Sequence, residues 1–180
     1  ARGLVCLAME PAMCDRLGLE MMVQHNTAPL QTAFTVSIDA ARDVSVGISA
    51  QDRAKTIRKA VDPQSTRADF VTPGHVFPLR AVPGGVLVRT GQTEGSVDLA
   101  RLAGRPAAGV ICEVLRDDGT MMRLPELIEF GRRHHLPVCT VADIVAHRLH
   151  TERHVERVAS THLPTDYGDF TVHAFRSTLD

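Results

Sequence analysis

Residues 73–95, PGHVFPLRAVPGGVLVRTGQTEG, constrain the fold of this chain more than any other stretch. Three prolines and paired glycines exclude a regular helix here, because proline breaks the helical hydrogen-bond pattern and glycine favours turns. The same stretch carries arginine, histidine, threonine and glutamate side chains. A polar segment that is rich in turns is typical of a binding site.

Two interpretations of this segment are open. In a phosphate-binding interpretation, Arg89 supplies a planar fork of N–H donors, and Thr93 with the backbone N–H groups of residues 91–93 binds the remaining oxygens. In the alternative, the segment is a pair of hairpin turns with a solvated arginine. The residues of this segment alone favour neither.

The composition predicts one soluble domain, because 180 residues with 44% apolar side chains suffice for a sizeable core. A formal net charge of −1, one tyrosine and no tryptophan provide neither a basic surface nor a stacking platform, so nucleic acid is not an expected partner. No apolar run approaches the roughly 20 residues of a membrane span, and no signal peptide is visible. We therefore expect a cytoplasmic protein without membrane contact.

The potential metal ligands form no recognisable pattern. Four cysteines lack CxxC spacing, which favours buried thiols over disulfides or zinc ligands: Cys6, Cys14, Cys112 and Cys139. His147, His150 and His154 share helical spacing, but they lie among charged residues without a completing cysteine or carboxylate. A solvated helix is favoured over a metal site there.

Periodicity and capping signals predict alternating strands and helices. Ser49 is a good N-cap, and Asp52 suits the positive end of the helix that follows it. The expected strands are 3–9, 32–38, 107–115 and 137–141, and the expected helices are 10–17, 50–61, 97–103, 125–134 and 142–150.

Glu113 is unusual because it lies inside the apolar strand expected at 107–115. A buried unpaired carboxylate is costly and demands a partner or a changed protonation state. Alternation puts Glu113 on the same face as Ile111 and Leu115, which favours a carboxylate in a cleft. The alternative is that it lies on the solvated side of the sheet.

Both ends of the sequence suggest a piece of a longer protein. The chain opens on an apolar run that reads as a strand already under way. The tail from residue 161, THLPTDYGDFTVHAF, begins a new turn and strand unit, as expected for an adjoining domain cut off after its first strand.

Seven stretches, in order, resemble one family, the 3,4-dihydroxy-2-butanone 4-phosphate synthases of riboflavin biosynthesis: MMVQHNT (21–27), FTVSIDA (34–40), GISAQDRAKTIR (47–58), PGHVFPLRA (73–81), GGVLVRTGQTE (84–94), LAGRPAAGVICEV (102–114) and DDGTMMR (117–123). The resemblance implies an α+β fold, a three-layer mixed α/β sandwich. It assigns residues 1–155 to this domain. Residues 156–180 resemble the linker and first strand of a GTP cyclohydrolase II domain, which implies a bifunctional parent protein.

The resemblance also implies a reaction. The family converts D-ribulose 5-phosphate to 3,4-dihydroxy-2-butanone 4-phosphate and formate, using Mg²⁺ (or Mn²⁺), in a homodimer. Carried over by motif, His75 and Glu113 match the catalytic residues and suit proton transfer. The substrate-binding positions are Arg89, Thr90, Gly91, Gln92, Thr93 and Glu113.

Two departures from the family pattern concern the metal. The family's acidic loop, of the pattern DDEDRENEGD, belongs upstream of the point at which this sequence starts. Gln92 stands where the family places a metal-binding histidine, in GQTE rather than GHTE, and a neutral amide is a weaker ligand. The resemblance thus implies that metal binding is weakened or absent and that the 180-residue chain has little activity. The alternatives are a non-catalytic domain that serves dimerisation or supports an attached cyclohydrolase, and a generic phosphosugar-binding module.

Overall fold

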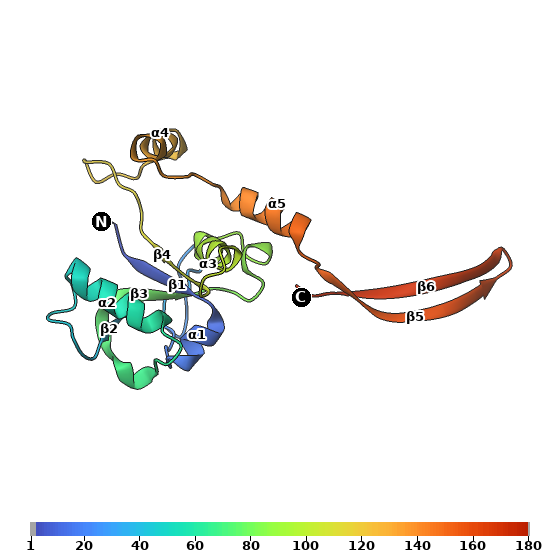
Figure 1. The fold of residues 1–180 in the computed structure, drawn as a ribbon, viewed down its shortest axis with the longest axis horizontal. Helices are drawn as coiled ribbons and strands as arrows, with labels where there is room; N and C mark the ends of the chain where they lie inside the picture. The colour runs from blue at the N-terminus through green and yellow to red at the C-terminus, as the bar shows by residue number, and fades with distance from the viewer. Residues whose placement is uncertain (1–2, 180) are drawn as a thin grey trace.

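The computed structural model describes residues 3–179 (Figure 1). Within this range, four strands form a mixed sheet in the order β2-β3-β1-β4. β1 runs parallel to β3 and antiparallel to β4, and β2 is antiparallel to β3. The mixed α and β architecture expected from the sequence is confirmed. The strands are β1 (Cys6–Met9), β2 (Ile38–Ala40), β3 (Phe70–Arg80) and β4 (Ala108–Ile111).

The central strand β1 separates two hydrophobic cores. Leu7 and Met9 belong to the cluster that includes Ala60 of helix α2 (Ala50–Val61), whereas Ala8 belongs to the cluster that includes Val97 of helix α3 (Gln92–Leu102). Successive side chains of a strand point to opposite faces of the sheet. Helices α2 and α3 therefore cover opposite faces, which gives three layers.

Helix α2 has the bounds predicted from its N-cap, and the Ser49 hydroxyl accepts a hydrogen bond from the Asp52 N–H at 3.0 Å. Its buried face is partly polar. Thr56 accepts a hydrogen bond from the backbone N–H of Ala40, and the Asp52 carboxylate accepts one from the Ser45 hydroxyl. The helix thereby holds the loop that connects it to β2.

The segment 73–95 is more regular than its prolines suggest. Strand β3 continues through Pro73 and Pro78, because a proline lacks only the N–H donor and the Pro78 carbonyl still accepts a bond from Thr35. Helix α3 begins at Gln92, five residues before the expected start at residue 97. The prediction of a segment rich in turns therefore holds only for its middle, and the exclusion of a regular helix was wrong from Gln92 onward.

Two predicted strands are absent from the described residues. In 32–38, only Phe34 and Thr35 make isolated bridges, and β2 begins at Ile38. The Gly74 N–H donates a hydrogen bond to the Ser37 hydroxyl, whereas in a regular ladder it would bond a backbone carbonyl of the neighbouring strand. The predicted strand 137–141 is irregular, because Thr140 caps helix α5 (Val141–Thr151) through Asp143 instead.

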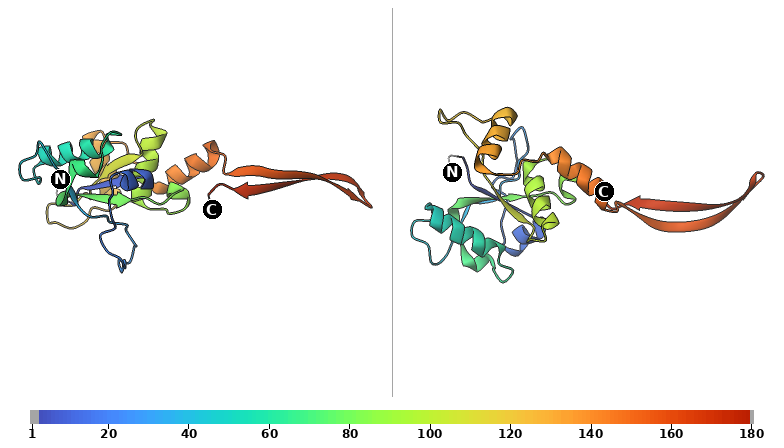
Figure 2. Two further views of the ribbon diagram at one scale, coloured as in Figure 1. Left: turned by 90° about the horizontal axis from the view of Figure 1, so that it is seen from below. Right: turned by 45° about the horizontal axis from the view of Figure 1, so that its top comes forward.

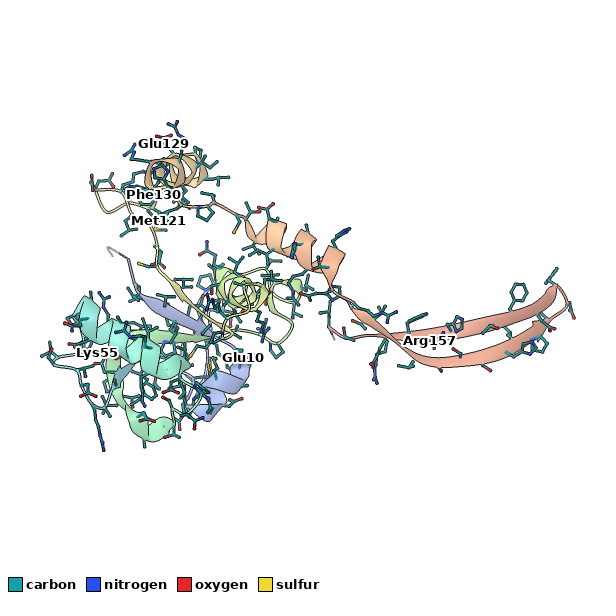
Figure 3. The ribbon with its side chains drawn as sticks, viewed as in Figure 1. Glu10, Lys55, Met121, Glu129, Phe130 and Arg157 are labelled. Atoms are coloured by element: carbon teal, nitrogen blue, oxygen red, sulfur yellow. The ribbon has the colours of Figure 1, made fainter. Side chains whose placement is uncertain are left out.

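The C-terminal third extends away from the sheet (Figures 1 and 2). Helix α4 (Leu124–His134) stands apart, and Figure 3 shows its Phe130 above Met121 of the preceding loop. Strands β5 (Val155–Thr165) and β6 (Gly168–Ser177) form an antiparallel hairpin that is exposed along nearly its whole length. The tail thus holds two strands, whereas the sequence predicted one. No helix among residues 3–179 has the length and apolar character needed to span a membrane.

Candidate active site

His75 lies on β3 and is held by Asp39 of the neighbouring strand β2. Its Nδ1 is 2.7 Å from Asp39 Oδ2, and its backbone N–H donates to Asp39 Oδ1 at 3.0 Å. The Asp39 residue is only 7% exposed, whereas the His75 side chain is 41% exposed. One edge of the imidazole is therefore anchored in the sheet while the ring stays accessible. Sequence reasoning missed Asp39; the available signal was a carboxylate in the β-rich stretch FTVSIDA.

Gly47 closes over this pair. Its backbone has φ +83°, and a Cβ built there would lie 2.1 Å from Asp39 Oδ2 and 2.7 Å from His75 Nδ1. Only glycine fits this combination of left-handed backbone and close approach. The Asp52 carboxylate accepts a hydrogen bond from the Gly47 N–H at 3.3 Å, so helix α2 positions the loop against the pair.

The sheet register brings His75 and Glu113 to one edge of the sheet, namely the end at which strand β1 begins. Cys6 of β1 pairs with Phe77 of β3 and with Ile111 of β4, so His75 and Glu113 each lie two residues beyond a partner of Cys6, toward the same edge. Strands β3 and β4 flank β1, so they are about 10 Å apart at a spacing of about 4.8 Å between neighbouring strands. The two residues that the motifs nominate for proton transfer thus share the edge at which β1 begins.

Glu113 itself differs from the prediction. Strand β4 ends at Ile111, so Glu113 is not inside a strand, and its residue is exposed rather than buried in an apolar cleft. Its carboxylate accepts a hydrogen bond from the Leu4 N–H at 3.1 Å. The strand ends early because the chain turns at Gly119 and Met122 then donates to the Val114 carbonyl. The solvated alternative describes Glu113 better.

Arg89 is already engaged within the protein. It donates to the Glu94 carboxylate at 2.5 Å and to the Leu30 carbonyl at 2.9 Å. Glu94 is 1% exposed, and its second oxygen accepts the Val82 N–H. A guanidinium carries five N–H donors, so these bonds leave others for a phosphate. Sequence reasoning missed Glu94, although it lies in the GQTE motif.

The candidate residues 90–93 lie at the start of α3. Gly91 is the N-cap, Thr90 and Gln92 are exposed, and Thr93 is buried. The first N–H groups of a helix have no intrahelical partner and favour anions. Near its other end, α3 is tied to Glu10, just after β1, by Arg101 at 2.6 Å. The first turn of α3 lies beyond the opposite end of β3 from His75, because its Glu94 carboxylate accepts the N–H of Val82, two residues after that strand ends.

A hollow of about 700 Å³ lies elsewhere, beside α2, on which Figure 3 labels Lys55. None of the candidate site residues lines it, so we do not assign it to the site. The residues that line this hollow are Ala40, Ala41, Arg42, Asp43, Lys55, Arg58, Lys59, Asp62, Ala68 and Asp69.

The described residues contain no metal-binding cluster. Within residues 3–179, no three histidine, cysteine or acidic side chains gather closely enough to hold a metal ion.

The cysteines take no part in the candidate site. Burial raises the pKa of the Cys6 and Cys14 thiols to about 11, which makes them poor nucleophiles. Cys112 is half-buried and Cys139 is exposed, so the expectation of buried thiols was correct for two of the four.

Comparisons with known proteins agree with the sequence motifs. Residues 1–147 match the family described as 3,4-dihydroxy-2-butanone 4-phosphate synthase. The riboflavin biosynthesis protein RibBA of Aquifex aeolicus is 55% identical over 180 residues, which cover 99% of this chain and 44% of that protein. The 3,4-dihydroxy-2-butanone 4-phosphate synthase of Pseudomonas aeruginosa is 49% identical, with 100% and 49% covered. The chain thus spans about half the length of these relatives.

Solved structures give the same result. A two-domain 3,4-dihydroxy-2-butanone 4-phosphate synthase from A. baumannii matches with a TM-score of 0.88 and 43% identity, over 100% of this chain and 53% of that one. A 3,4-dihydroxy-2-butanone 4-phosphate synthase in complex with two magnesium ions matches with a TM-score of 0.80 and 43% identity, over 83% of this chain and 74% of that one. The chain therefore belongs to the 3,4-dihydroxy-2-butanone 4-phosphate synthase family.

Proposed function

We propose that the protein carrying this chain converts D-ribulose 5-phosphate to 3,4-dihydroxy-2-butanone 4-phosphate and formate in riboflavin biosynthesis. The observation that supports this most is the shared sheet edge of His75 and Glu113. Family membership and the names of the relatives support the same chemistry.

The proposed roles follow from the contacts of each residue. His75 is the base that removes a carbon-bound proton from the sugar, because its ring is both anchored by Asp39 and open to solvent. Glu113 is a second proton-transfer group for the oxygens that change during rearrangement. The substrate phosphate lies at the first turn of α3, against Thr90, Gln92, Thr93 and the donors of Arg89 that Glu94 and Leu30 leave free.

The described residues do not by themselves make a magnesium site. Gln92 is exposed and can offer one carboxamide oxygen, but no cluster of three strong ligands exists among residues 3–179. We propose that Mg²⁺ or Mn²⁺ binds weakly here with Gln92 as one ligand. Our proposal for proton transfer depends only on His75 and Glu113.

The assembly and domain proposals concern the parent protein. We propose a cytoplasmic homodimer, and we propose that residues 1–155 form the synthase domain. Residues 156–180 would open a GTP cyclohydrolase II domain, starting with the hairpin β5–β6. The relatives named RibBA, about twice as long as this chain, support a bifunctional parent.

The second candidate is a non-catalytic synthase domain kept for dimerisation or for supporting an attached domain. Gln92 favours it, because the amide weakens any metal site. Formate release from D-ribulose 5-phosphate with added Mg²⁺, measured on the full natural polypeptide, separates the two. We expect turnover that His75→Ala abolishes and that His162→Ala, on the distant hairpin, leaves unchanged. No turnover by the unmodified polypeptide would favour the non-catalytic domain.

A further inference from the structure

Asp39 makes a two-point contact with His75 that nothing in the family motifs assigns. One carboxylate oxygen accepts the His75 backbone N–H at 3.0 Å, and the other lies 2.7 Å from Nδ1 of the ring. The backbone contact fixes the carboxylate relative to β3, and the ring contact then fixes the imidazole relative to the carboxylate. The ring orientation is thus set by the pairing of two strands.

The chemistry of the pair determines where the ring proton resides. An ionised carboxylate only accepts hydrogen bonds, so Nδ1 must carry the proton in this contact. In a neutral imidazole the other nitrogen, Nε2, is then the free acceptor. We propose that Asp39 is a positioning residue that holds His75 in the Nδ1–H tautomer and leaves Nε2 as the base. This inference rests on the proposed function of His75.

The surroundings make this arrangement rigid. Asp39 lies in β2 next to the buried Ile38, so its backbone cannot move without disturbing the core. Gly47 packs against both partners, and Asp52 of α2 fixes the loop that carries Gly47. A ring held by Asp39 and packed against Gly47 retains one orientation, which proton transfer to a bound substrate requires.

A second histidine–aspartate pair in this chain shows the contrast. His162 and Asp169 lie on the hairpin with 3.6 Å between Nε2 and a carboxylate oxygen, and their side chains are 63% and 74% exposed. This contact involves the ring alone, is longer than a hydrogen bond and has no covering loop. It therefore provides a matched control in the same molecule.

The direct test is the ring tautomer of His75. Imidazole ¹⁵N chemical shifts of the labelled 180-residue chain distinguish Nδ1–H from Nε2–H at a pH where the ring is neutral. We expect Nδ1–H in the unmodified chain. In Asp39→Asn, the amide oxygen can still accept the His75 backbone N–H while its NH₂ group donates to Nδ1, so the ring should switch to Nε2–H. Asp169→Asn should leave His75 unchanged.

An Nε2–H tautomer in the unmodified chain, or an unchanged tautomer in a folded Asp39→Asn chain, would overturn the proposal. If Asp39→Asn does not fold, the unmodified spectrum decides alone. In the full natural polypeptide, Asp39→Asn should lower kcat by about 10²–10⁴-fold with little change in KM, because the substitution alters the tautomer of the His75 ring and not the binding of the substrate. A change in KM alone would also contradict the proposal. The spectra require no turnover, so they remain decisive if the proposed function fails.

Discussion

Two glycines in the domain differ in whether the fold requires them. Gly74 lies where β2 and β3 touch, and a Cβ there would be 2.0 Å from the carbonyl carbon of Ile38, a backbone atom that cannot give way. Gly95 lies inside α3, where a Cβ would meet only side-chain carbons at 3.5 Å or more. The first glycine is required by close approach, whereas the second is only a weak point of a helix.

We predict that Gly74→Ala destabilises the domain by about 2–4 kcal/mol, through displacement of β2 from β3. Gly95→Ala should stabilise it by about 0.5–1 kcal/mol, because alanine has the higher helix propensity and space is available. Urea unfolding of both variants checks the pair. Equal effects of the two substitutions would contradict this account of the glycines.

At the same scale, local signals predicted some residues and could not predict others. Ser49 and Asp52 were identified because a helix cap depends on neighbours three residues apart. Asp39 was missed because its partner, His75, lies 36 residues away and only strand pairing brings them together. The sequence stretch containing Glu113 predicted a strand, but a turn that ends the strand early overrode its apolar pattern.

Among the elements, α5 contacts the domain through the buried Ile144 and through a nearly buried ion pair. Arg148 of α5 donates to the Asp98 carboxylate of α3 at 2.8 Å and to the Gly84 carbonyl at 2.8 Å. Asp98 is 2% exposed and also accepts the Val86 N–H. Removing the arginine leaves a buried carboxylate without its main counter-charge.

Arg148→Leu should therefore destabilise the domain by about 3 kcal/mol and reduce the hydrogen-exchange protection of α5. Arg132→Leu is the control, because Arg132 pairs with Glu129 on the exposed surface of α4, and such pairs contribute about 0–1 kcal/mol. Similar losses in both variants would mean that the Asp98 contact does not attach α5.

The loop before α2 should respond to acid through Asp52. The hydrogen bond from the Ser45 hydroxyl is the main reason that the pKa of Asp52 lies below its ordinary value. Further hydrogen bonds from the Ser45 backbone, the Ser49 hydroxyl and the Gly47 backbone lower this pKa as well. The unfolded chain then binds the proton more readily, so this stabilisation is present above the ordinary value of about 3.9 and is lost as the pH falls through the folded pKa. Between pH 6 and pH 2.5, the thermal unfolding temperature should fall less steeply for Asp52→Asn than for the unmodified chain. Parallel curves would exclude a role for Asp52 in acid stability.

Elements with strong local signals were predicted well, as the bounds of α2 show. Strand β3 was not recognised, because its prolines are tolerated where their missing N–H groups have no ladder role, which only the partner strands determine. The strand expected at 137–141 failed for the opposite reason, since a local capping box at Thr140 outcompeted a short apolar run.

The whole molecule combines a three-layer domain with an extended hairpin (Figure 1). On the hairpin, register places Leu163 opposite Phe170 and Thr161 opposite Val172, so one face is apolar, while His162 and Ser160 lie on the other face with Thr171 and His173. An exposed ribbon with one apolar face suits packing against further protein. This agrees with the proposal that the hairpin opens a second domain.

The central claim is that one sheet edge joins His75 and Glu113 in a single catalytic site. The most direct test is formate release by the full natural polypeptide for His75→Ala, Glu113→Gln and the double variant. Residues that act in one site have non-additive effects, so the double variant should lose little more turnover than the more damaging single variant. Losses that multiply, or turnover that survives either single change, would contradict a shared site at this edge.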